Sequence, residues 1–506
     1  MLHPLDYVVI VLYLSGVVYF GIRSAGRQQT TRDYFLGSRE LPWWAISFSI
    51  VATETSTLTV IGIPAVAYGG TMTFFQLTFG YLLGRVVVAF LFLPRYMAGD
   101  MQTAYTYLGE RFGVRMQRLS SVTFLGTRLL ADGVRLFATA IPIRIIALSA
   151  GVDLGYPMII LGIGILTAIY TYVGGFKAVV WMDVVQMSVY LVGAIVTIGL
   201  LLGALPAGAW SDITQAGKAQ VFFADFSLQA ILTQPYVLIT AVIGGGVFSM
   251  ASHGTDQLIV QRLLSCKDLG DARKALIGSA FFVMGQFAVF LIVGALLWAF
   301  YDGASAAQLG LGRLDEVFPK YIIEQLPVGV AGLVLAGILA AAMSTLSSSL
   351  NALASSSITD LFGSYFSKKD DAVTLKMSRY MTLGWALVLV FFATLFESRQ
   401  NPVVELGLSI ASFTYGSLLG AFLLGQLVKR VQERDALIAF VVGVIAMILI
   451  IFGVWITPDG SWMFMLNPEE QTKVALSLSP IAWPWYTAIG SGITILIGSL
   501  LSLMHR

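Results

Sequence analysis

The sequence has 506 residues, of which 57% are hydrophobic and only 11% are charged, and its mean hydropathy is +0.82. Soluble domains carry roughly 25% charged residues, so this composition predicts a membrane protein and leaves no room for a soluble catalytic domain. The formal net charge of +2 excludes a nucleic-acid binder. The single cysteine, Cys266, excludes an internal disulfide, and three histidines argue against a histidine-ligated metal centre.

Apolar runs of membrane-spanning length recur along the whole chain. They predict an all-α polytopic membrane protein with about thirteen transmembrane helices, folded as a single membrane domain over residues 1–506. The predicted helices cover residues 5–22, 44–68, 74–94, 120–149, 156–174, 180–204, 235–253, 275–301, 325–357, 379–396, 404–427, 436–456 and 481–503. The first is followed by a basic loop and lacks a small-residue cleavage site, so we expect a retained helix rather than a signal peptide.

The distribution of basic residues predicts the orientation, because cytoplasmic loops retain Lys and Arg. With the N-terminus outside, the inside loops hold most of them, Arg262 included. The outside loops then hold only Lys218, Arg313, Lys320, Arg399 and Lys473. An even number of helices would place Arg506 outside and spoil this asymmetry. We therefore expect a multi-pass plasma-membrane protein, in a bacterial inner membrane, with its N-terminus outside and its C-terminus in the cytoplasm.

The second predicted helix contains a polar, β-branched run at residues 50–59, with Glu54 near its centre. A charge at mid-bilayer costs about 3 kcal/mol even on insertion scales, so Glu54 must face protein, water or an ion. Hydroxyl side chains compete for backbone hydrogen bonds, which favours local unwinding and frees carbonyl oxygens to bind a cation. The alternative is a Ser/Thr-rich stripe that packs against another helix.

A second interruption is predicted at residues 244–257, where three glycines precede a polar run. Two broken helices at corresponding positions of two halves are typical of inverted-repeat transporters. The halves would be residues 44–205 and 235–427. One extra helix, 5–22, precedes them and two extra helices, within 436–503, follow them.

Two further polar features lie within apolar helices. Hydroxyl groups that suit a weakly held small cation share one face of a helix, at Ser344, Ser347 and Ser348; helix packing is the alternative. Asp183 follows a double glycine at 174–175. Either Asp183 complements the dipole of the helix that it opens, or it supplies the charge of a sodium site.

Three motifs in this order resemble the sodium/solute symporter family, whose members include sodium/glucose, proline and bacterial sialic acid symporters. They are GGFKAVVWMDVVQ at 174–186, TDQLIVQR at 255–262 and AAAMSTLSSS at 340–349. The resemblance covers nearly the whole chain. It implies a LeuT-type core of two inverted five-helix repeats and sodium-coupled uptake by alternating access.

The resemblance also implies sodium ligands. The main site would use carbonyl oxygens of Ala52, Thr55 and Ala341 and hydroxyls of Ser344 and Thr345. Some family members bind a second sodium with an aspartate and nearby serines, which match Asp183, Ser344, Ser347 and Ser348. We therefore expect sodium as the coupling ion and two sodium ions per solute. The family's Trp-Thr-Asp is Trp-Met-Asp at 181–183, which retains the acid.

The solute is expected beside the two breaks. The candidate binding residues are Thr53, Glu54, Ser56, Thr59, Phe75, Gln76, Arg135, Ser249, Ser252 and His253. Arg135 either pairs with Asp132, three residues earlier, or holds a substrate carboxylate, as an arginine on this helix does in the sialic acid symporters that the chain resembles. Glu54 could bind a substrate amine, help to hold sodium or accept a proton.

These residues predict a sodium-coupled symporter of a small carboxylate-bearing solute, such as an amino acid, an organic acid or sialic acid. A sodium/sugar symporter and a transporter-like solute sensor are the alternatives. We do not expect an enzyme, because no His cluster, carboxylate pair or nucleophile with its base is evident. The expected partners are sodium ions, the small organic solute and the lipid bilayer, with neither nucleic acid nor an obligate protein partner.

Overall fold

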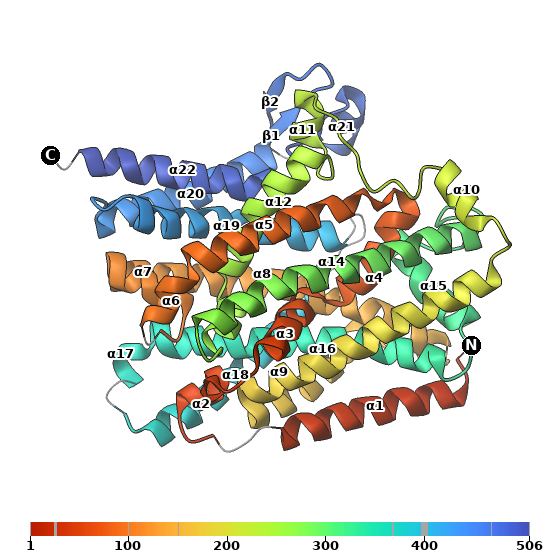
Figure 1. The fold of residues 1–506 in the computed structure, drawn as a ribbon, viewed down its shortest axis with the longest axis horizontal. Coiled ribbons are helices and arrows are strands. Elements are labelled where there is room, and N and C mark those ends of the chain that lie inside the picture. Colours follow the sequence, from red (N-terminus) through yellow and green to blue (C-terminus); the bar gives the residue numbers. More distant parts are fainter. Residues whose placement is uncertain are drawn as a thin grey trace.

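Long helices run side by side along the longest axis of the molecule, and most of the short helices lie near the two ends of this bundle (Figure 1). The structure, a computed structural model, describes residues 2–24, 28–99, 101–149, 151–366, 369–395, 403–466 and 468–504. In this part of the chain, eight helices are long and apolar enough to cross a membrane, and a bent helix pair makes up to nine.

A helix covers at least part of each of the thirteen predicted segments. The helices concerned are α1 (Pro4–Arg23), α3 (Trp43–Glu54) with α4 (Thr57–Gly69), α5 (Leu77–Leu91), α8 (Val114–Ser149), α9 (Tyr156–Ala204), α12 (Gly245–Gly254), α14 (Leu269–Phe300), α16 (Val330–Ser356), α18 (Asp371–Thr394), α19 (Val403–Leu427), α20 (Glu433–Gly453) and α22 (Pro484–Leu503). The shorter helices are α2 (Thr31–Leu36), α6 (Leu93–Ala98), α7 (Ala104–Phe112), α10 (Ala209–Gln215), α11 (Leu228–Thr233), α13 (Gln257–Leu264), α15 (Val317–Gln325), α17 (Gly363–Phe366) and α21 (Glu470–Leu476).

Helix α16 is the centre of the bundle. Of its most apolar window, 83% is buried, compared with 17% for the peripheral helix α1. Helix α16 packs against α9, α1, α8, α18 and α3. The serine-rich stretch of α16 is therefore enclosed by protein rather than exposed to lipid.

The first predicted break is present at Thr55 and Ser56, where α3 and α4 meet at a bend of 66°. Both residues have extended backbone angles. Because a helix end leaves its last carbonyl groups without intrahelical partners, the end of α3 presents free backbone oxygen atoms. The sequence therefore predicted this interruption correctly.

The second break lies within the predicted range 244–257, close to its end. The glycines at 244–246 are helical, and the helix ends only at Thr255 and Asp256, between α12 and α13. Two glycines of α5, Gly80 and Gly84, allow α12 to pack closely against α5 at this position. A Cβ atom at Gly84 would lie 2.3 Å from the carbonyl oxygen of Gly246. Glycine here serves backbone approach rather than helix breaking.

The predicted helices 156–174 and 180–204 are joined in α9, which is kinked at Gly175 (φ 57°, ψ −161°). A side chain is disfavoured at this positive φ, and a Cβ atom would also lie 2.9 Å from the Tyr34 ring. Asp183 follows well beyond the first turn after the kink. Its interpretation as a residue that opens the helix and complements its dipole is therefore wrong.

A small antiparallel sheet departs from the all-α prediction. Its strands are β1 (Val454–Ile456), β2 (Trp462–Phe464) and β3 (Ser479–Pro480), in the order β2-β1-β3. Trp455 pairs with Met463 and Pro480. The sheet, α11 and α21 form a projection on one side of the bundle (Figure 1). The β-branched end of the predicted helix 436–456 thus becomes a strand.

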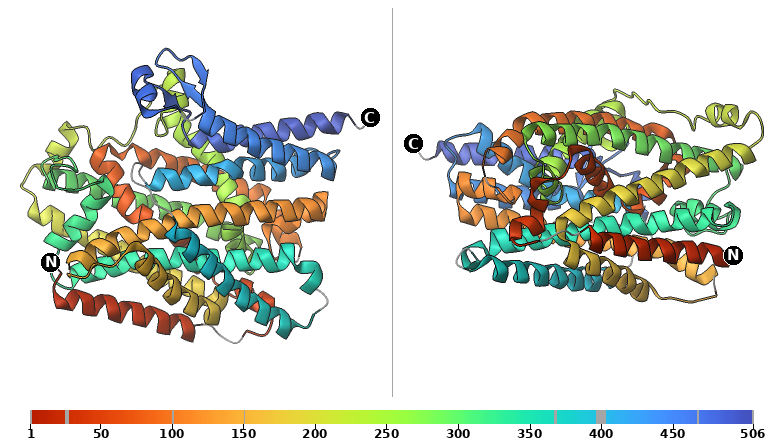
Figure 2. Two further views of the ribbon diagram at one scale, coloured as in Figure 1. Left: turned by 180° about the vertical axis from the view of Figure 1, so that it is seen from behind. Right: turned by 60° about the horizontal axis from the view of Figure 1, so that its bottom comes forward.

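The two ends of the chain lie at opposite ends of the bundle in every view (Figures 1 and 2). Several basic residues that were counted as loop residues for the topology lie in helices, and one of them, Arg262 in α13, is also fully buried. Four others, Arg27, Lys368, Arg399 and Arg506, lie outside the described residues.

A central cavity between the two helix breaks

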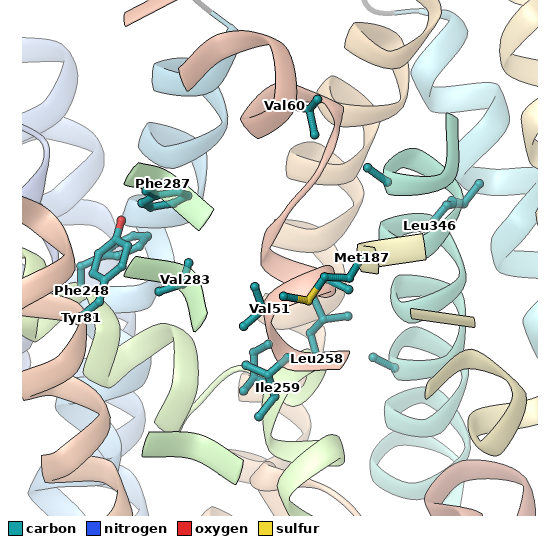
Figure 3. Packing of buried hydrophobic residues seen from close by; sticks show 14 of the residues in the cluster. Val51, Val60, Tyr81, Met187, Phe248, Leu258, Ile259, Val283, Phe287 and Leu346 are labelled. Atoms are coloured by element: carbon teal, nitrogen blue, oxygen red, sulfur yellow. The ribbon is translucent and has the colours of Figure 1, made fainter. Parts of the chain in front are cut away.

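A cavity with about 920 Å³ of empty space, open solvent included, lies between the two helix breaks. One wall is aromatic: the Tyr81 ring lies 6.3 Å from that of Phe248 and 6.5 Å from that of Phe287, between centroids (Figure 3). The wall brings together α5, α12 and α14.

Most of the candidate solute-binding residues line this cavity. These are Thr53, Glu54, Ser56, Thr59, Arg135, Ser252 and His253. They come from both sides of the first break, from α8 and from the end of α12. Helices far apart in sequence thus place hydroxyl groups, an acid, a guanidinium and an imidazole around one space.

Three candidates do not line the cavity. Gln76 donates hydrogen bonds to the backbone of Tyr236 at 2.6 Å and of Phe223 at 3.4 Å, and so supports an extended segment. Phe75 packs on another ring, and Phe74, its neighbour in a 3-10 helix, faces the cavity instead. Ser249 lies one turn back from His253 and donates to the carbonyl oxygen of Tyr81. The sequence could not predict the 3-10 helix that directs Phe74, rather than Phe75 or Gln76, toward the cavity.

Both carboxylate oxygens of Glu54 are hydrogen-bonded. Arg85 Nη2 donates to Glu54 Oε2 at 2.6 Å, and His253 Nε2 lies 2.8 Å from Oε1. The Arg85 side chain is completely buried and also donates to Ser279 at 2.5 Å. The charge of Glu54 is therefore balanced within the protein, at the edge of the cavity.

A second group of charges connects α8 to the second break. Arg128 Nη2 lies 3.1 Å from Asp256 Oδ2 and donates to the Tyr415 hydroxyl at 2.7 Å, while Tyr415 donates to Asp256. Nη1 of Arg128 and Nη1 of Arg135 lie 3.6 and 3.7 Å from Asp132 Oδ1. The predicted pairing of Asp132 with Arg135 is present, but it is long and is shared with Arg128.

The predicted residues of the main sodium site lie on two helices that touch each other, Ala52 and Thr55 at the end of α3 and Ala341, Ser344 and Thr345 on α16. The Ser344 hydroxyl lies 3.5 Å from the carbonyl oxygen of Ala52, and the Thr345 hydroxyl donates to the carbonyl oxygen of Ala341 at 3.1 Å. The Thr55 hydroxyl accepts a hydrogen bond from the Gln286 side chain at 2.6 Å. Backbone and hydroxyl oxygens are hard neutral ligands that fit a small alkali cation.

The residues predicted for a second sodium are also adjacent to one another. Asp183 accepts hydrogen bonds from Ser344 and Ser49, each at 2.5 Å. Arg262 Nη2 lies 3.1 Å from Asp183 Oδ2 and also donates to Ser348. Ser347 donates to the backbone of Ser344 at 3.0 Å. An arginine side chain thus bridges Asp183 and Ser348.

Sequence reasoning missed the partners of these charges. The missed residues are Arg85, Arg128, Asp256, Arg262, Ser49 and Tyr415. A charge within an apolar segment was a usable signal for Arg85 and Arg128, because such a charge needs a partner. Which partner it finds depends on tertiary packing, to which the sequence pattern gives no access.

Comparison with known proteins identifies relatives along nearly the whole chain. The sodium/sialic acid symporter NanT of Aliivibrio fischeri is 29% identical over 461 residues, which cover 91% of this chain and 89% of that protein. The sodium/sialic acid symporter SiaT of Proteus mirabilis is 26% identical over 460 residues, which cover 89% and 90%.

A solved structure shares the fold. It shows a Na⁺-coupled sialic acid symporter in a substrate-bound outward-open state, and it matches with a TM-score of 0.79 at 24% identity over 99% of this chain and 98% of that one. The family model described as "Sodium:solute symporter family" matches residues 34–443. Because this match spans most of the sequence, the chain belongs to the sodium:solute symporter family and is a multi-pass membrane protein that couples solute transport to sodium.

Proposed function

We propose that this symporter carries a small carboxylate-bearing solute, such as sialic acid or another organic acid, together with sodium by alternating access. The observation that carries the proposal is Arg135. Its side chain is 20% exposed, lines the cavity, and makes no hydrogen bond within the described residues; its counter-ion Asp132 is 3.7 Å away. A guanidinium with free donors can bind a carboxylate through two parallel hydrogen bonds.

The engagement of Glu54 favours an organic acid over an amino acid. An amine would have to compete with Arg85 and His253 for the carboxylate, which both groups already contact at 2.6 and 2.8 Å. A buried pair of this kind is costly to break, because one charge is left without a partner. The structure therefore supports a role of Glu54 in stabilising the first helix break rather than a role in binding a substrate amine.

Two sodium ions are proposed to bind beside this cavity. The main ion would be held by oxygen atoms of Ala52 and Thr55, at the end of α3, and of Ala341, Ser344 and Thr345, on α16. The second would be held by Asp183, Ser344, Ser347 and Ser348. Support comes from the burial of these polar groups and from their mutual contacts.

The proposed architecture is thirteen transmembrane helices with a LeuT-type core of two inverted five-helix repeats. Residues 44–205 and 235–427 form the repeats, and each contains one broken helix. The N-terminus is proposed to lie outside and the C-terminus in the cytoplasm of a bacterium. Support comes from the position of the two chain ends at opposite ends of the bundle, as an odd number of crossings requires (Figure 2).

Uptake into proteoliposomes tests the solute class. Sialic acid, lactate, proline and glucose represent an acidic sugar, a small acid, a zwitterion and a neutral sugar. We expect uptake of an acid, and its loss in Arg135→Gln. The matched control is Arg144→Gln, on the same helix and 3.7 Å from the exposed Asp153. Uptake of glucose alone, or full activity of Arg135→Gln, would contradict the proposal.

A further inference from the structure

Asp132 is a buried carboxylate in helix α8. Only 2% of its side chain is exposed, and neither of its oxygen atoms has a hydrogen-bond partner among the described residues. It lies between two guanidinium groups, 3.6 Å from Arg128 and 3.7 Å from Arg135. Glu54 and Asp183, by contrast, each accept hydrogen bonds from two or more side chains.

Asp132 also adjoins the predicted main sodium site. A second, smaller cavity with about 240 Å³ of empty space brings Asp132 and Arg135 together with Ser56 and Thr345. Ser56 and Arg135 line the central cavity as well. The charge of Asp132 would therefore repel a solute carboxylate at Arg135 and attract a sodium ion beside Thr345.

The charges around the cavities balance in three groups. Arg85 faces Glu54, Arg262 faces Asp183, and two arginines, Arg128 and Arg135, face Asp132 and Asp256. With His253 neutral, each of these three groups has no net charge in the absence of solute and sodium. Of these four carboxylates, Asp132 alone accepts no hydrogen bond from the residues that the structure describes.

We propose that Asp132 determines the order of binding, so that sodium binds first. Its negative charge lowers the affinity of the empty site for the solute anion and raises the affinity of that site for sodium. The inference rests on the proposed carboxylate solute at Arg135. Without Asp132 the group would carry a net positive charge, and an anion could bind and cross without sodium. Two unit charges within about 10 Å, at an effective dielectric constant near 20, change an affinity about tenfold or more.

The first test measures sodium alone, by titration of the intrinsic tryptophan fluorescence of the purified full-length protein. Asp132→Asn is expected to weaken sodium binding about tenfold, and Arg135→Gln to tighten it about tenfold, because the two changes shift the local charge in opposite directions. Asp132→Glu, which keeps the charge, is expected to stay near the wild type. Equal sodium affinity in all four proteins would overturn the proposal.

The second test measures the binding of sialic acid in sodium chloride and in potassium chloride. Asp132→Asn is expected to bind sialic acid about tenfold more tightly than the wild type in potassium chloride, and to show sodium-independent uptake in proteoliposomes. The factor by which sodium strengthens sialic acid binding is expected to stay the same, because it reports the attraction between the two ligands. If Asp132 had a purely structural role, Asp132→Asn would bind both sodium and sialic acid more weakly, and that result contradicts the proposal.

Failure of this inference is distinguishable from failure of the proposed function. If Arg135→Gln abolishes sialic acid binding while both Asp132 variants behave as the wild type, Asp132 has no such role and the solute assignment stands. If Arg135→Gln binds sialic acid normally, the solute assignment fails. Should Asp132→Asn not fold, Arg135→Gln still decides: unchanged or weaker sodium binding in that variant overturns the role of local charge.

Discussion

The guanidinium of Arg262 lies 3.1 Å from the carboxylate of Asp183, and both side chains are completely buried. The pair joins α13, the second half of one broken helix, to the middle of α9. Asp183 also receives hydrogen bonds from α3 and α16, through Ser49 and Ser344. Four helices therefore meet at one carboxylate, beside the proposed second sodium.

Asp183→Asn is predicted to remove the second sodium and to destabilise the fold. The amide keeps hydrogen-bonding atoms but leaves Arg262 as a buried charge without a counter-ion, which costs about 3–5 kcal/mol. The slope of uptake against sodium concentration should fall to that of a single ion. Asp183→Glu keeps the charge and serves as the control. If the slope of uptake against sodium concentration stays above one in Asp183→Asn, Asp183 is not a ligand of the second sodium.

Thr345→Ala is predicted to weaken the main sodium site. It removes one hydroxyl oxygen beside the carbonyl group of Ala341, so the sodium concentration for half-maximal uptake should rise about tenfold, equivalent to about 1.4 kcal/mol. Thr345→Ser retains the oxygen and should restore the wild-type value. Ser188→Ala, on the exposed face of α9, is a further control. If both Thr345 variants behave alike, the hydroxyl is not a ligand.

The pair of Glu54 and Arg85 is predicted to stabilise the first break. Either single variant, Glu54→Gln or Arg85→Gln, leaves a buried charge without its partner. Each should lower the free energy of unfolding by about 3 kcal/mol or more. The double variant should be more stable than the sum of the two losses implies, which a double-mutant cycle measures directly. Additive losses would show that the 2.6 Å contact contributes no coupling.

Gly84→Ala is predicted to separate α5 from α12. The added Cβ atom would lie 2.3 Å from the carbonyl oxygen of Gly246, and forcing a methyl group into such a contact costs about 1–3 kcal/mol. Gly162→Ala in α9, where no atom lies within 4 Å of the new Cβ, is the matched control. Equal melting temperatures for the two variants would contradict the packing described for the second broken helix.

The sequence predicted the fold well where hydrophobic runs and polar interruptions determine it. A helix lies on every predicted segment, and the first break falls at Thr55 and Ser56 because hydroxyl groups and Glu54 disfavour a continuous lipid-facing helix. The second break also falls within the predicted range, at Thr255 and Asp256. The glycines at 244–246 are helical, because a glycine in a membrane helix serves close packing as readily as unwinding. The sheet at 454–480 was missed because its strands are only two or three residues long.

The candidate site was predicted in its residue types but, apart from Asp132 with Arg135, not in its charge pairings. Seven of the ten proposed solute-binding residues line the cavity, yet Phe75 and Gln76 point elsewhere because a 3-10 turn changes which neighbour faces inward. The pair of Asp132 and Arg135, three residues apart, was predicted, but the arginine partners of Glu54 and Asp183 lie 31 and 79 residues away in sequence. Such pairings depend on how helices pack, and a single sequence does not contain that information.

Sodium-driven accumulation of sialic acid tests the central claim most directly. Proteoliposomes that contain the full-length protein receive an inward sodium gradient, and labelled sialic acid is followed over time. The account predicts transient accumulation above the external concentration with sodium, and none when potassium replaces sodium on both sides. Equal uptake in sodium and in potassium would contradict it.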